Sequence, residues 1–247
     1  MNLWTLEVAR LWRTRRLIAL LAVYVLPGLG LPVLTYELPS LLKHSSPDVG
    51  IIAPPPTPIS SLTSFASNSA QLGTLVLVIV AAATNVLDAH PGIAAFYRSR
   101  TRLARRLLLP RLAALAAAAA IGLAAGVGCC WYETEVLIGA LQAAPLAGGY
   151  AMELLWITFC LALVSVYSAF TSSVAAAAGS TIATLLALSL FAVIAPLKPW
   201  LPTHLATSIA SLSGPHPTGP EWKAIAVTAV TSFALVAIAT RSVRRQR

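Results

Sequence analysis

Long apolar blocks separated by polar segments constrain this chain more than any other feature of its sequence. Each block holds roughly 20 residues with almost no charge, which is the length of α-helix that crosses a hydrocarbon core about 30 Å thick. Only 10% of the residues are charged and 57% are hydrophobic, whereas a soluble domain carries about 25% charged residues. The sequence therefore predicts an all-α integral membrane protein and excludes an ordinary soluble domain.

The apolar blocks predict six transmembrane helices within a single transmembrane domain that covers residues 1–247. Helices are expected because lipid offers no hydrogen-bond partners to the backbone of an irregular segment. The stretch 37–69 is rich in proline and serine, and we expect it to form an extramembrane loop. The predicted spans are about 17–36, 70–87, 107–131, 149–170, 174–196 and 222–240.

Three apolar segments need separate interpretation. Residues 1–16 mix leucine, valine and tryptophan with arginines, a pattern that predicts an amphipathic helix lying in the membrane interface. The segment 196–222 is interrupted by prolines and glycines, and its apolar insert His204 to Leu212 is shorter than a span. The run that begins at Leu17 is too long for the apolar region of a cleaved signal peptide, so we expect it to remain as the first span.

The basic residues predict the orientation of the chain. The formal net charge is +9, but the arginines form clusters beside the apolar blocks and do not cover one soluble face, so we expect no nucleic-acid partner. The clusters lie at the amino terminus, after the second span and in the carboxyl-terminal tail, whereas Lys43, Lys198 and Lys223 fall on the opposite side. The positive-inside rule then predicts a protein of the bacterial plasma membrane with both termini in the cytoplasm.

The sequence lacks the common motifs of enzymatic chemistry. A phosphate-binding P-loop needs a lysine directly after a glycine, and none of the lysines follows glycine, so we expect no nucleotide hydrolysis by this chain. The histidines and cysteines show no metal-ligand spacing, and no GxSxG motif occurs, so we predict no metal and no other cofactor. An intramembrane enzyme would also need acidic or histidine groups deep in the spans, which the sequence does not provide.

Glu153 is the one acidic residue inside a predicted span, about one turn from the outer end of the fourth. A secondary transporter normally places several charged groups within its spans, so the sequence disfavours that class. Two interpretations of Glu153 remain open. It is either a polar contact in a substrate path or a carboxylate that reaches up to the outer interface.

The segment between the second and third spans has the composition of a short docking helix. Asp88 is followed by Pro91, which is a good first-turn residue. A helix from there would place four side chains on adjoining faces: Ile93, Phe96, Tyr97 and Arg100. Such a helix suits a cleft in a soluble partner.

This segment also has a simpler interpretation as a membrane anchor. Phe96 and Tyr97 would then sit in the aromatic belt at headgroup depth. For Arg105, Arg106 and Arg111, which lie close to the third span, we favour binding to lipid phosphates.

On three features the chain resembles the type-2 ABC exporter permeases, whose subunits have six spans and pair with separate ATPase subunits. The first feature is the amphipathic amino-terminal helix, which leads into the first span through the run from Trp12 to Arg16. The second is the stretch from Asp88 to Gly92 and the basic run after it. The third is the outer segment with Leu201–His204 and Ser211–Gly214, followed by a last span and an arginine-rich tail.

The resemblance implies a permease subunit of an ATP-binding cassette exporter, which is not itself an enzyme. ATP and Mg²⁺ would be held by ABC ATPase subunits, and a second permease subunit, identical or homologous, would complete the path. The substrate would be hydrophobic or amphipathic, such as a drug or antibiotic, a lipid or a peptide, since the path has few charges.

The resemblance also implies a coupling helix at Gly92–Arg100 and a re-entrant element at Pro199–Gly214. The residues assigned to coupling are Asp88, Gly92, Ile93, Phe96, Tyr97, Arg98 and Arg100. Members of the family usually have glutamate-rich sequence before that glycine, where this chain has Asp88-Ala-His90-Pro91. An alternative function from another class is a non-transporting membrane scaffold or sensor subunit that uses the same docking helix.

Overall fold

The computed structural model describes residues 3–45, 55–86, 104–194, 196–214 and 222–245. Within these residues every regular element is a helix. Six helical segments are long and apolar enough to cross a membrane. The chain is therefore an all-α protein with the six candidate spans expected of a multi-pass membrane protein.

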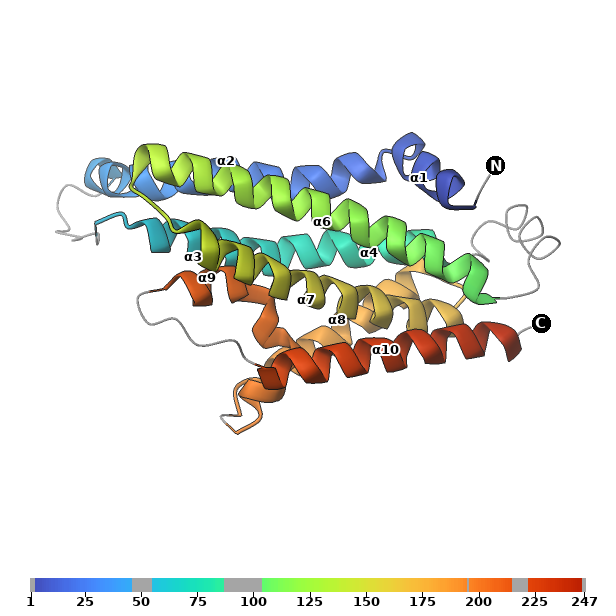
Figure 1. Ribbon diagram of the computed structural model, residues 1–247. Helices are drawn as coiled ribbons and strands as arrows, with labels where there is room; N and C mark the ends of the chain where they lie inside the picture. Colours follow the sequence, from blue (N-terminus) through green and yellow to red (C-terminus); the bar gives the residue numbers. More distant parts are fainter. Residues whose placement is uncertain (1–2, 46–54, 87–103, 195, 215–221, 246–247) are drawn as a thin grey trace.

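The six apolar segments run in alternating directions and form one elongated bundle (Figure 1). Helix α7 is the most enclosed, since 61% of its apolar window is buried, against 17–22% for α2, α8 and α10. The outer helices therefore leave most of their apolar surface uncovered. The segments are α2 (Arg16–Ser45), α3 to α4 (Pro58–Asn85), α6 (Ala104–Leu137), α7 (Ala143–Phe170), α8 (Val174–Phe191) and α10 (Trp222–Arg245).

A short helix, α1 (Leu3–Arg13), precedes the first apolar segment and meets it at a sharp elbow. The backbone N–H and the hydroxyl of Thr14 both donate to the Arg10 carbonyl, which closes the end of α1. Arg15 follows with a φ of 57°, the left-handed conformation common just after a helix. The elbow turns α1 away from the axis of α2 and lays it against α6.

Helices α2 and α6 approach closely because glycines replace side chains along their contact. A Cβ atom on Gly126 would lie 2.6 Å from the Tyr24 carbonyl oxygen, and one on Gly122 would lie 2.9 Å from the Leu20 carbonyl oxygen. Gly28 faces the backbone of Gly126 from the other side. Gly122 and Gly126 form a GxxxG pair, the spacing that lets two membrane helices pack backbone to backbone.

The second apolar segment begins earlier than the sequence predicts. Helix α2 extends to Ser45 instead of ending near residue 36, and α3 (Pro58–Asn68) occupies part of the predicted loop. Thr57 caps α3 through a reciprocal pair of hydrogen bonds with Ser60. The serines and threonines here fit a helix because their hydroxyls donate to carbonyls of the preceding turn, as Thr63 does to Ile59.

Residues 196–214 fold back onto the bundle as three short helices. They are η2 (Lys198–Trp200), η3 (Pro202–Thr207) and α9 (Ser208–Ser213). Leu205 and Ile209 are buried, and Ile209 packs directly on Gly149 of α7, where a side chain would collide with its backbone. This segment covers one end of α7, at the end of the bundle away from the chain termini (Figure 1).

Candidate functional site

The predicted coupling residues lie outside the residues that the structure describes. They are Asp88, Gly92, Ile93, Phe96, Tyr97, Arg98 and Arg100. The structure does describe the two helices that bracket them, because α4 (Thr74–Asn85) ends just before this stretch and α6 begins just after it. Both helix ends lie at the same end of the bundle as α1 (Figure 1).

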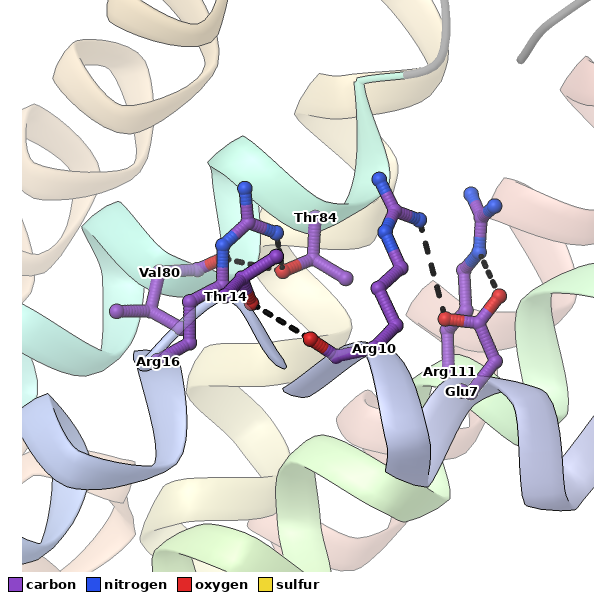
Figure 2. A network of polar contacts seen from close by, with 7 residues as sticks. All are labelled: Glu7, Arg10, Thr14, Arg16, Val80, Thr84 and Arg111. Atoms are coloured by element: carbon purple, nitrogen blue, oxygen red, sulfur yellow. Dashed lines mark hydrogen bonds and ion pairs between the residues drawn. The ribbon is translucent and has the colours of Figure 1, made fainter. Parts of the chain in front are cut away.

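A buried ion pair joins α1 to α6 at this end. The Arg111 Nε donates to the Glu7 Oε1 over 2.9 Å, and the two side chains are only 1% and 3% exposed. Arg10 approaches the other oxygen of the same carboxylate at 3.9 Å. Figure 2 shows the two guanidinium groups next to each other, each directed at a different oxygen of the Glu7 carboxylate.

A second polar link joins the start of α2 to the end of α4. The Arg16 Nη1 donates to the Thr84 Oγ1 over 2.7 Å, and the Thr84 hydroxyl donates in turn to the Val80 carbonyl (Figure 2). Together with the Glu7–Arg111 pair, this bond fastens the α1–α2 elbow to both helices that bracket residues 87–103. We call Glu7, Arg10, Arg16, Thr84 and Arg111 the elbow network.

The elbow network corrects the interpretation of Arg111 as a ligand of lipid phosphates. Arg111 is buried and bonded to a carboxylate within the protein, so that part of the prediction is wrong. The side chains of Arg105 and Arg106 lie outside the described part of the chain. Glu7 stands four residues before Leu11, so the two side chains share one face of the helix, which the structure buries, but the sequence did not indicate Arg111 as the partner.

Glu153 lies deeper in the bundle than the sequence analysis placed it. It stands ten residues after Ala143, about 15 Å along the axis of α7. Only 2% of the residue is exposed, and its Oε1 atom has no hydrogen-bond partner. The carboxyl group is thus enclosed by protein, and the two interpretations of its role stay predictions.

Aromatic residues from two helices lie around Glu153. Tyr24 of α2 is buried, and it reaches the second apolar segment next to Thr74. Its ring lies against Gly73, where a Cβ atom would come within 2.6 Å of Cε1. Trp156, one turn after Glu153, donates from Nε1 to the Thr74 Oγ1 over 3.0 Å. Three apolar segments therefore converge at this acid, and we call Tyr24, Gly73, Thr74, Glu153 and Trp156 the Glu153 centre.

A π-helical turn, η1 (Ser69–Gly73), interrupts the second apolar segment beside this centre. Such a turn inserts one extra residue into a helix, and it occurs often at functional sites. Here it ends at Gly73, whose missing side chain leaves room for the Tyr24 ring. The Tyr24 ring thus packs against the last residue of the π-helical turn.

An apolar cleft of about 250 Å³ opens between α6 and α7, away from the elbow network. Its lining includes Val127, Gly128 and Trp131 from α6 and Leu146, Ala147 and Tyr150 from α7. Tyr150 stands at the end of the cleft toward the middle of the bundle, where its hydroxyl donates to the Ala120 carbonyl over 3.0 Å. Glu153 follows Tyr150 by three residues on the same helix.

In the described part of the chain, no group of three or more His, Cys, Asp or Glu side chains is arranged to hold a metal ion. Cys129, Cys130 and Cys160 are free thiols. Comparison of the chain with models of protein families and with curated proteins found no match. The resemblance to exporter permeases therefore stays a prediction from the sequence.

Proposed function

We propose that the chain is the membrane-spanning permease subunit of an ATP-driven exporter in the bacterial plasma membrane, and that it moves an amphipathic or hydrophobic substrate. Separate ABC ATPase subunits would bind and hydrolyse ATP. The observation that supports this proposal best is the elbow network, which fastens one structural unit to both helices flanking residues 87–103.

The elbow network suits the transmission of force from a docked partner. In this proposal the coupling helix lies within residues 87–103, and movement of an ATPase pushes it. The push reaches α4 and α6 directly, and it reaches α1 and α2 through Thr84 and Arg111. Four helices would then move as one body, the kind of rigid-body switch that opens a path alternately to each side.

The exposure of side chains on α1, α8 and α10 and the position of residues 199–214 support the remaining parts of the proposal. Trp12 is 72% exposed on α1 beside exposed arginines, which suits a helix lying in the membrane interface. Residues 199–214 form the proposed re-entrant element at the far end of the bundle. The sparsely buried α8 and α10 leave apolar surface for lipid and for a second permease subunit.

The proposal is tested by purifying the full-length chain from its native membrane and identifying the proteins that accompany it. We expect an ATPase among them. Phe96→Ala combined with Tyr97→Ala should release it, since buried aromatic anchors often contribute about 2 kcal/mol or more each to an interface. Tyr132→Ala is the matched control, because it removes an aromatic side chain that is 64% exposed at the opposite end of the bundle.

A separate variant tests the elbow network in the same assay. Glu7→Gln weakens the network without altering residues 87–103, so the ATPase should stay bound while substrate export per ATP hydrolysed falls. Export at the parental rate by the Phe96→Ala, Tyr97→Ala protein would overturn the coupling assignment. A main partner other than an ATPase would instead favour the non-transporting scaffold or sensor subunit.

A further inference from the structure

Glu153 is a buried acid without a cationic partner in the described part of the chain. None of the ion pairs among the described residues includes it, and its Oε1 is enclosed without a hydrogen bond. Charged groups inside membrane helices are costly and mark substrate or ion pathways when they lack a structural role. The feature that would complement Glu153 is a positive charge that arrives with a ligand.

The aromatic residues of the Glu153 centre suit such a charge. Tyr24 and Trp156 are both buried, at 2% and 6% exposure, and they come from different helices. Aromatic faces attract ammonium groups, most strongly where water is excluded. An acidic group near buried aromatic side chains favours an amine as the ligand.

The apolar cleft lies next to this centre along α7. Tyr150 lines the cleft, and Glu153 is about 4.5 Å further along the helix axis and on an adjoining face. The Tyr150 hydroxyl donates to the Ala120 carbonyl of α6, which holds this ring at the cleft. Glu153 itself does not line the cleft, so a ligand that reached both would require the Tyr150 side chain to move.

We propose that the cleft and Glu153 together bind an amphipathic cation. The apolar tail lies in the cleft against Val127, Trp131 and Leu146, and the amine passes Tyr150 to meet the Glu153 carboxylate. The identity of this ligand as the exported substrate rests on the proposed function, whereas the binding itself does not. On the proposed function, this site would narrow the substrate class to amphiphiles with a basic group.

The test is equilibrium binding to the full-length protein in lipid nanodiscs, measured by titration calorimetry with empty nanodiscs subtracted. Octylamine is the cationic probe and octanol is the neutral probe with the same tail. Glu153→Gln should weaken octylamine binding by about tenfold or more, which corresponds to the loss of one charge-assisted hydrogen bond. It should leave octanol binding unchanged.

Two control substitutions separate the acid from general charge and from folding. Glu135→Gln removes the same charge from an exposed site on α6 and should change neither affinity. Glu153→Asp keeps the charge and should keep the preference for the amine. Equal octylamine affinity of the parent and a folded Glu153→Gln protein would overturn the proposal.

The cleft is tested independently of Glu153, in case that substitution prevents folding. Ala147→Trp fills the cleft and should abolish binding of both probes, whereas Ala151→Trp, one turn further along α7 at another exposed position, should not. Retained octylamine binding by Ala147→Trp would show that the cleft is not the site. These binding measurements need no ATPase, so they test the site separately from the exporter. If binding follows these expectations but the purification from native membrane yields no ATPase, the exporter is overturned and the binding site stands.

Discussion

The Glu7–Arg111 ion pair differs from surface ion pairs because both side chains are withdrawn from solvent. Exposed pairs contribute about 0–1 kcal/mol. When one member of a buried pair is removed, the other charge is left without compensation, which costs about 3–5 kcal/mol. Arg10 stays near Glu7 and would offset part of that loss if Arg111 were replaced.

We therefore expect Arg111→Met to lower the free energy of unfolding by about 3 kcal/mol. Arg13→Met removes the same charge from an exposed position of α1 and should change it by less than about 0.5 kcal/mol. Denaturant titration of the purified proteins measures both. If the two substitutions have equal effects, the Glu7–Arg111 pair does not stabilise the packing of α1 on α6.

Single residues also show where the sequence was informative about the site. Glu153 lies on α7, against which η3 and α9 fold back from about 50 residues away, and α2 and α4 also pack on this helix or beside it. Hydropathy along one helix does not report such neighbours, so the sequence located the acid but could not show that it is enclosed. Arg111 was misread for a related reason, since Glu7 is 104 positions away.

At the scale of elements, the existence of six apolar helices could be predicted because hydropathy and helix length are local properties. The ends of the helices could not be predicted from hydropathy. Serine and threonine lower the local hydropathy, but inside a helix their hydroxyls form hydrogen bonds with backbone carbonyls. Ser61 illustrates this point, because it is buried and shares a hydrogen bond of 3.0 Å with Thr134 of α6. The π-helical turn at Ser69–Gly73 has no composition that distinguishes it from α-helix.

The contact between α2 and α6 makes a prediction at this scale. Gly126→Ala would place a methyl group 2.6 Å from the Tyr24 carbonyl oxygen, so the helices must separate. We expect a loss of about 1–3 kcal/mol, the usual cost of overpacking. Gly128→Ala is the matched control, since nothing lies within 4 Å of the new methyl group.

Gly128→Ala should leave the free energy of unfolding unchanged or raise it by up to about 1 kcal/mol, because alanine has a higher helix propensity than glycine. Thermal unfolding of both variants in the same detergent gives the comparison. Equal midpoints for Gly126→Ala and Gly128→Ala would mean that α2 and α6 are not packed backbone to backbone at Gly126.

For the whole molecule, the described arginines are segregated at one end of the long axis of the bundle. Arg10, Arg13, Arg15, Arg16, Arg111 and Arg241 lie at the end that holds both termini, as the helix directions in Figure 1 show. Glu37, Glu133 and Glu135 lie on helices near the opposite end. The fold thus brings together arginine clusters that are far apart in the sequence. The positive-inside count assumes that these clusters lie on the same side of the membrane.

The orientation of the molecule follows from this segregation as a prediction. Arginines near the ends of spans are retained on the cytoplasmic side, so the elbow at Thr14 should lie inside the cell and the turn at Gln142, between α6 and α7, outside. Both positions are exposed, and they lie at opposite ends of the bundle.

Single cysteines at either position, in a background with Cys129, Cys130 and Cys160 replaced, report the side by labelling with a membrane-impermeant maleimide in intact cells. We expect the reagent to modify the cysteine at position 142 in intact cells and the cysteine at position 14 only after the cells are opened. The reverse pattern would place the elbow network and residues 87–103 outside, where no cytoplasmic ATPase could reach them, and would rule out the proposed exporter.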